Sequence, residues 1–260
     1  MSIRGTTTLV VIGVLLSLAD LVQRLIIAPL AHLLPSRRHG ILAAWQQLMA
    51  LTVLGPTRFI GGADTGDVPR VPARPGDLIL MNHQSLFDIP LVVRSVRPGY
   101  PRIVTRTRYA SGKPLISHMV RLYQYPTVNP RATGPAELAE LAEDTAASPV
   151  PIVIYPEGTR TRDGSLGRFK RSGLRAVLPA RDWRVWLVVA DGYWECAKLA
   201  DFRKNVSDIQ GSVRVVGPLE GPGAGASRQE VDEFIRSVES QMGGLLGDLR
   251  AERLPSGAGP

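Results

Sequence analysis

From residue 77 onward, short apolar runs alternate with stretches of helical periodicity. An apolar run of about five residues is typical of a strand buried on both faces, and the stretches between such runs suit covering helices. This alternation predicts an α/β fold with a single mixed sheet covered by helices. We expect strands at residues 77–81, 102–105, 151–155, 185–189 and 212–216, and helices at 89–96, 114–123, 136–147 and 172–178. A last helix is expected to follow Ser227, which forms a capping box with Glu230.

Composition limits the kind of domain further. Hydrophobic residues make up 44% of the 260 residues, which is enough for a sizeable core in one compact domain. The single cysteine excludes a disulfide scaffold and a thiolate zinc site. With 31 Lys and Arg against 23 Asp and Glu, the net charge is +8, so the partner is expected to be anionic: a nucleic acid, a membrane surface or a phosphorylated substrate.

The N-terminal region is apolar enough to meet a membrane. Its apolar runs cover residues 6–19, 21–34 and 41–54. Asp20 and Arg24 interrupt the first two runs, and their spacing of four lets them pair on one helix face. Four interpretations stay open: a cleaved signal, a spanning helix, a helical hairpin that lies in one leaflet, and a buried soluble helix.

In the hairpin interpretation, Pro29 and Pro35 interrupt the apolar segment, and Trp45 is expected to act as an interfacial anchor. The domain boundaries follow from this interpretation. We expect a membrane-associated helical segment at residues 1–56, a catalytic domain at 57–254 and a flexible tail at 255–260.

The segment Asn-His-Gln-Ser-Leu-Phe-Asp, residues 82–88, directly follows the first predicted strand. In α/β sheets, ligands bind at the carboxyl ends of strands. Asp88 follows His83 by five residues, which on one continuous helix places them about 140° apart, so we expect the chain to turn and a helix to start near Asp88. An aspartate bound to one imidazole nitrogen leaves the other free to take a proton, which makes the pair a candidate general base. The alternatives are a structural histidine and an aspartate that caps the helix.

The segment Tyr-Pro-Glu-Gly-Thr-Arg, residues 155–160, follows another predicted strand. Gly158 permits close backbone approach, Thr159 adds a hydroxyl, and Arg160 has the forked N–H groups that bind phosphate. Glu157 is expected to orient the arginine or to bind a substrate hydroxyl. An ordinary turn is the alternative for this segment alone, but two motifs at strand ends are expected to face the same edge of the sheet.

Together the two segments resemble the hallmarks of the lysophospholipid acyltransferases, the family of 1-acyl-glycerol-3-phosphate acyltransferases. The first segment matches Asn-His-x-Ser-x-x-Asp fully, and the second matches Phe-Pro-Glu-Gly-Thr-Arg-Ser with Tyr155 for Phe and Thr161 for Ser. The resemblance covers residues 40–218. It departs at 125–131, where the family's leading Gly is missing, and at 184–189, where the family's prolines are missing.

The resemblance implies roles for particular residues. His83 is the implied catalytic base, Asp88 its partner, and Asn82 and Ser85 support the motif. The implied substrate-binding residues are Glu157, Gly158, Thr159, Arg160 and Arg131. No metal site is expected.

The reaction implied by the resemblance is transfer of a fatty acyl group to the free hydroxyl of a lysophospholipid, 1-acyl-sn-glycerol-3-phosphate above all. Acyl-CoA or acyl-ACP is the implied co-substrate, and no bound cofactor is expected. Membrane lipids, the lysophospholipid acceptor and the acyl carrier are the expected partners, and nucleic acid is not. The expected location is the cytoplasmic face of a bacterial inner membrane.

Other functions stay open from the sequence. Another lyso-lipid, such as a lyso-ornithine lipid, or glycerol 3-phosphate is an alternative acceptor. A basic non-catalytic membrane protein or a nucleic-acid-binding protein is the alternative outside the class. A metal-dependent phosphoesterase needs further clusters of ligands, which His32, His39 and His118 do not provide.

Overall fold

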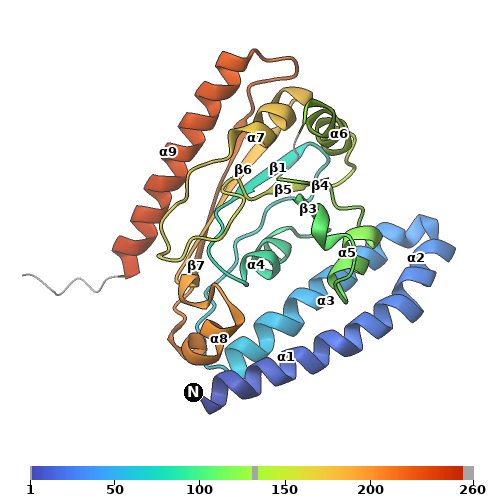
Figure 1. Cartoon of the computed structure of the whole chain (residues 1–260), viewed down its shortest axis with the longest axis vertical. Helices are drawn as coiled ribbons and strands as arrows, with labels where there is room; N and C mark the ends of the chain where they lie inside the picture. The colour runs from blue at the N-terminus through green and yellow to red at the C-terminus, as the bar shows by residue number, and fades with distance from the viewer. Residues whose placement is uncertain (1, 131–133, 254–260) are drawn as a thin grey trace, which may run out of the picture.

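The computed structural model describes residues 2–130 and 134–253 and is built around a central five-stranded sheet (Figure 1). The strand order is β2-β5-β1-β6-β7. The parallel strands are β1 (Asp77–Met81), β2 (Arg102–Ile103), β5 (Ile152–Ile154) and β6 (Arg184–Asp191), and β7 (Ser212–Glu220) runs antiparallel to β6. The predicted mixed sheet covered by helices is therefore confirmed, and a small two-stranded sheet is present in addition.

Successive residues of β1 point to opposite faces of the sheet, and each face meets its own layer of helices. Ile79 and Met81 lie in a core cluster with residues from the layer on their side, whereas Leu78 and Leu80 lie in a second cluster on the other side. The first layer includes α3 (Arg38–Phe59), α4 (Asp88–Ser95) and α8 (Leu199–Asn205), and the second includes α6 (Pro135–Ala146), α7 (Arg171–Val177) and α9 (Arg228–Arg253). Because both faces are covered, β1 is apolar from Leu78 to Met81.

The expected strand at residues 102–105 is divided between two sheets. Its first two residues form β2, and Thr105 begins β3 (Thr105–Arg106), which pairs in parallel with β4 (Thr127–Val128) in a separate two-stranded ladder. The chain then continues into α5 (Ile116–Leu122). The sequence pattern also missed α8, which is short and largely charged or polar.

The N-terminal residues form a helical hairpin on one side of the sheet (Figure 1). Its first arm consists of α1 (Ile3–Val22), a π-helical turn (Gln23–Ile27) and α2 (Ala28–Leu33), and its second arm is α3. By length and composition, the helix at Ile3–Leu33 is sufficient to cross a membrane. The expected pair is present, with Arg24 Nε 3.0 Å from Asp20 Oδ1. The boundary expected after residue 56 falls inside α3, because this helix continues to Phe59.

Two expectations for the hairpin are wrong. Pro29 does not interrupt the first arm, because the wider π-helical turn just before it relieves the clash of the proline ring with the preceding turn. Trp45 is not an interfacial anchor: it is only 7% exposed, and its indole N–H donates to Gln23 Oε1 at 2.8 Å between the two arms.

Candidate active site

The two sequence motifs meet at one edge of the sheet. β1 and β5 are parallel neighbours, with Leu80 opposite Ile154 in the register. Their carboxyl ends therefore lie side by side, and residues 82–88 and 155–160 leave the sheet at the same edge. The expectation that both motifs face one edge is confirmed.

His83 and Asp88 are in direct contact. The imidazole Nδ1 lies 2.6 Å from Asp88 Oδ2. Because an ionised carboxylate only accepts hydrogen bonds, Nδ1 carries the proton and Nε2 is the acceptor. Nε2 has no hydrogen-bond partner among the described residues, and the His83 side chain is 18% exposed. The geometry is that of an oriented base with one nitrogen left for a substrate proton.

Asp88 is held rigidly by the turn that precedes α4. Its Oδ2 also accepts the backbone N–H of Gln84 at 2.7 Å and of Ser85 at 2.9 Å, and its Oδ1 accepts the Ser85 hydroxyl at 3.0 Å. The side chain is completely buried. Asp88 is the first residue of α4, as expected, but its carboxylate bonds to the upstream turn rather than capping the helix.

Asn82 and Ser85 support this turn. The Asn82 amide donates to Ala190 O and accepts from Ala190 N, both at 2.8 Å, so it fixes the end of β1 to β6. The Ser85 hydroxyl, besides bonding Asp88, accepts the backbone N–H of Phe87 at 3.0 Å. Each motif residue therefore has a partner that holds the His83 loop in place.

Glu157 is not placed to bind substrate. It is 3% exposed, and its two oxygens accept the backbone N–H of His83 and of Gly167, each at 2.6 Å. The pKa of Glu157 is raised to about 7, mainly because the carboxyl group is buried. The two N–H donors lower this pKa and the nearby charge of Asp88 raises it, but burial has the largest effect. We expected Glu157 to bind substrate, and this expectation is corrected: both of its oxygens are occupied by main-chain donors, which gives it a positioning role.

The 155–161 loop holds His83 on the remaining sides. Thr161 N donates to His83 O at 3.0 Å, and the Tyr155 ring stacks on the imidazole with centroids 4.5 Å apart. Gly158 adopts φ +65°, the left-handed region that favours glycine, where the loop turns. Thr159 and Arg160 are exposed at the surface of this turn. Arg131 lies outside the described residues.

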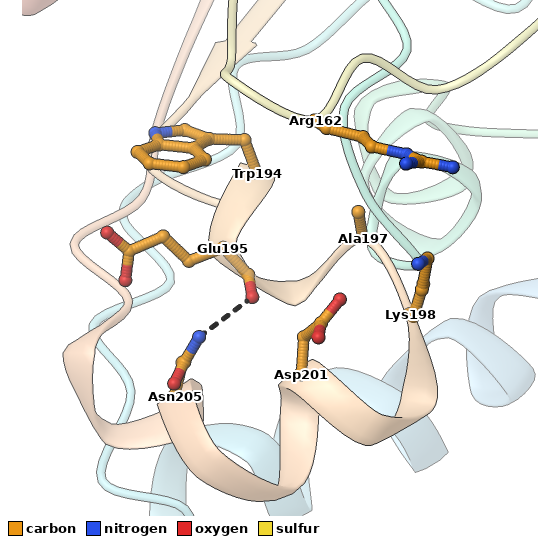
Figure 2. Close-up of a pocket in the computed structure, with 7 residues that line it drawn as sticks. All are labelled: Arg162, Trp194, Glu195, Ala197, Lys198, Asp201 and Asn205. Carbon is orange, nitrogen blue, oxygen red and sulfur yellow. Dashed lines mark hydrogen bonds between the residues drawn. The ribbon is translucent and has the colours of Figure 1, made fainter.

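Arg160 lies beside an open hollow of about 460 Å³. Its guanidinium donates to Ala197 O at 2.7 Å, and Ala197 lines the hollow. Figure 2 shows Arg162 and Lys198 on one side of this hollow and Trp194 and Glu195 on the other, with Asp201 and Asn205 below. Cationic side chains thus reach the surface next to the His83 loop.

Sequence reasoning missed a buried polar network behind this loop. Gln84 donates to Gly164 O at 2.9 Å and to Asp191 Oδ1 at 3.3 Å. Arg250 of α9 also bonds Gly164 O and lies 3.4 Å from Asp191 Oδ1, and Arg253 lies 2.9 Å from Asp191 Oδ2. The one available signal was the aspartate that ends β6 directly after the apolar residues 185–190. Within residues 2–130 and 134–253, no group of three His, Cys, Asp or Glu residues could hold a metal ion.

A family model for acyltransferases matches residues 65–189, the part of the chain that contains both motifs. The chain carries a domain of the acyltransferase family. The crystal structure of the 1-acyl-sn-glycerophosphate (LPA) acyltransferase PlsC from Thermotoga maritima is similar to this acyltransferase, with a TM-score of 0.51 and 18% identity over 89% of this chain and 98% of that one. The likeness supports a common fold over the 89% of the chain that is covered. No curated protein sequence matches this acyltransferase.

Proposed function

We propose that the acyltransferase moves a fatty acyl group from a thioester, acyl-CoA or acyl-ACP, to the free hydroxyl of a lysophospholipid, with 1-acyl-sn-glycerol-3-phosphate as the acceptor. The observation that carries this proposal is the His83–Asp88 pair, in which Nε2 alone is open to a substrate. The similarity to an LPA acyltransferase supports the choice of acceptor.

In the proposed mechanism, His83 Nε2 takes the proton of the acceptor hydroxyl as its oxygen attacks the thioester carbonyl. A new ester C–O bond forms in a tetrahedral intermediate, whose collapse breaks the C–S bond. The imidazolium returns the proton to the leaving thiolate. Asp88 fixes the tautomer and stabilises the imidazolium, and general-base help of this kind contributes roughly 10²–10⁴ in rate.

No covalent acyl-enzyme is required in this scheme. Ser85 is buried and its hydroxyl is committed to Asp88 and to Phe87 N. Cys196 is buried, and burial raises the pKa of its thiol to about 12, which disfavours the thiolate needed for attack. Direct transfer between the two substrates therefore fits the chain better than a ping-pong reaction.

Anionic groups of the substrates are proposed to bind beside this base. Arg160 is exposed in the loop that holds His83, and Arg162 and Lys198 face the neighbouring hollow. Both the lysophosphatidate headgroup and the carrier of the acyl donor contain phosphate, which arginine binds with paired N–H groups. Positioning of this kind supplies the proximity contribution to the rate.

The N-terminal hairpin is proposed to attach the enzyme to the membrane that contains its lipid substrate, at the cytoplasmic face of a bacterial inner membrane. Large apolar side chains are exposed along its first arm: Val10, Val14, Leu18, Leu21, Leu25 and Ile26. The length of this arm permits a spanning helix, whereas its packing against α3 and its side-on apolar surface fit a hairpin in one leaflet better.

The test is acyl transfer by the purified full chain in detergent, with His83→Ala against the unchanged protein. We expect His83→Ala to lose at least about 10²-fold of the rate and to keep its binding to vesicles. An active His83→Ala variant would falsify the mechanism. A panel of acceptors (lysophosphatidate, a lyso-ornithine lipid, glycerol 3-phosphate) with each donor type then identifies the substrates.

A further inference from the structure

A second hollow lies at the opposite end of the sheet from His83. It has a volume of about 430 Å³ and is lined by three arginines, two prolines and an alanine: Arg70, Pro72, Ala73, Arg74, Arg97 and Pro98. Arg74 precedes β1, whereas His83 follows it, so the length of this five-residue strand, about 17 Å, separates the two ends. The hollow is therefore distinct from the catalytic edge.

The arginines of this hollow have no anionic partner among the described residues. Neither Arg70, Arg74 and Arg97 nor the adjacent Arg94 forms an ion pair within the part of the chain that the structure describes. Arg97 donates to Val68 O at 3.2 Å, but its Nε is buried and has no hydrogen-bond partner in residues 2–130 and 134–253. Burial, and then the charges of Arg94 and Arg70, lower the pKa of Arg97.

Two acidic residues lie three positions from these arginines, and neither neutralises them: Asp67 forms no ion pair within the described part of the chain, and Asp77 is bonded elsewhere. Asp77 follows Arg74 by three residues, yet its Oδ1 accepts from Arg184 Nε at 2.8 Å and from the Trp186 indole at 3.2 Å. Its Oδ2 accepts only the main-chain N–H of Arg74, at 3.0 Å. Like charges that are gathered without a counter-ion favour the binding of an external anion.

The arginine cluster borders the second arm of the hairpin. Gln47 of α3 donates to Val93 O at 2.6 Å and to Val96 O at 3.1 Å, and it accepts from Arg94 Nη1 at 2.8 Å. One turn further along this face of α3, Leu51 is 45% exposed. Arg94 therefore connects this cluster to the face of α3 on which Leu51 is exposed.

We propose that the hollow lined by Arg70, Arg74 and Arg97, with Arg94 next to it, binds the phosphate of an anionic phospholipid headgroup as an anchoring ligand, separate from the substrate at His83. Arginine forks match the oxygens of a phosphate, and a cluster of four gives preference for lipids with net negative charge over zwitterionic ones. The exposed side chain of Leu51 on α3 offers an apolar contact for an acyl chain of the same lipid. The proposal goes beyond the acyl-transfer function and does not require catalysis.

The test is sedimentation of the full chain with vesicles of phosphatidylcholine alone or of phosphatidylcholine with one-fifth phosphatidylglycerol. The variant Arg70→Gln/Arg74→Gln removes two exposed charges, so folding is expected to be unaffected. Its matched control, Arg228→Gln/Arg236→Gln, removes two exposed charges from α9. We expect Arg70→Gln/Arg74→Gln to lose about 10-fold or more of its affinity for the vesicles that contain phosphatidylglycerol, with no loss for vesicles of phosphatidylcholine alone. The control is expected to bind both kinds of vesicle as the unchanged protein does.

Equal losses in the two variants would overturn the proposal, because they would show attraction by net charge only. Unchanged binding by Arg70→Gln/Arg74→Gln would overturn it as well. A further arm uses inorganic phosphate: protection of the unchanged protein against thermal unfolding by millimolar phosphate, without any preference for anionic vesicles, would assign the hollow to a soluble anion instead of a lipid. Because vesicle binding needs no catalysis, failure of the acyl-transfer assay leaves this result intact.

Discussion

Tyr155 shows how one buried hydroxyl affects stability next to His83, the proposed base. Its ring stacks on His83, while its hydroxyl is buried without a hydrogen-bond partner among the described residues. A buried polar group without a partner costs about 1–3 kcal/mol. We predict that Tyr155→Phe keeps its acyl-transfer rate and gains about 1 kcal/mol in the free energy of unfolding, measured by denaturant titration in detergent.

Tyr193→Phe is the matched control for this prediction. The Tyr193 hydroxyl is also buried, but it donates to Thr65 O at 2.6 Å. Its removal leaves a carbonyl without its donor, so this variant is expected to lose about 1 kcal/mol. Equal destabilisation of the two variants would contradict our account of the Tyr155 hydroxyl.

Glu157 makes stability depend on pH in a defined window. Its pKa rises from 4.5 to about 7 on folding, so between these pH values the folded chain binds more protons than the unfolded chain. The free energy of unfolding therefore falls as pH rises through this window, by about 3 kcal/mol for this group. We predict that this fall is absent in Glu157→Gln, compared with the unchanged protein by unfolding at pH 5 and pH 8. A parallel pH dependence in the two proteins would contradict the prediction.

Glu157→Gln also tests the positioning role. A glutamine offers one acceptor oxygen where two main-chain N–H groups, of His83 and Gly167, need acceptors. We expect the rate of acyl transfer to fall in this variant because the His83 loop loses one of its supports. A direct substrate contact would instead raise KM alone.

At the scale of elements, α9 is more than a cover for the sheet. Its Arg250 bonds the carbonyl of Gly164, in the stretch that follows Arg160, and lies beside the buried Asp191. We predict that Arg250→Ala lowers the free energy of unfolding by about 1–3 kcal/mol and lowers kcat/KM, because Gly164 O and Asp191 each lose a partner. Arg250→Lys is expected to restore part of kcat/KM, since it retains the charge.

Arg236→Ala is the control on the same helix. Arg236 is exposed, and the described residues give it no ion pair or hydrogen bond, so its loss is expected to change the free energy of unfolding by less than about 0.5 kcal/mol. If Arg250→Ala behaves like Arg236→Ala in both measurements, α9 does not position the loop.

The elements also show how far sequence reasoning reaches. β1, β5 and β6 were predictable because both faces of each strand are buried, and α9 because Ser227 and Glu230 exchange hydrogen bonds of 2.7 and 3.3 Å as a capping box. The contact between His83 and Asp88 was also predictable, because two residues five positions apart can meet only if the chain turns before the helix begins. The bonds of Glu157 and Arg250 depend on chain segments far apart in sequence, so no local pattern indicates them.

At the scale of the whole molecule, the exposed apolar face of the hairpin predicts how the enzyme partitions to lipid. Val14 and Leu18 are 54% and 56% exposed and lie one turn apart on this face. We predict that Val14→Asp/Leu18→Asp reduces binding to phosphatidylcholine vesicles by about 10-fold or more, because charge opposes insertion of an apolar face. Sedimentation measures the bound fraction.

Gln229→Asp/Gln241→Asp on α9 is the control, since it adds the same two charges at exposed positions far from the hairpin (Figure 1). This variant is expected to bind as the unchanged protein does. A comparable loss in the two variants would attribute the effect to net charge and remove the hairpin from the explanation.

The main chain of His83 is bonded on both sides by the loop of the second motif: its N–H by Glu157 and its carbonyl by Thr161. The proposed base and the arginine-bearing turn therefore form one mechanical unit, although Glu157 follows His83 by 74 residues in the sequence. In a chimera of related acyltransferases, the two loops would therefore have to be transferred together. A chimera that receives either loop alone inherits a base whose backbone no longer has the partners that aim it.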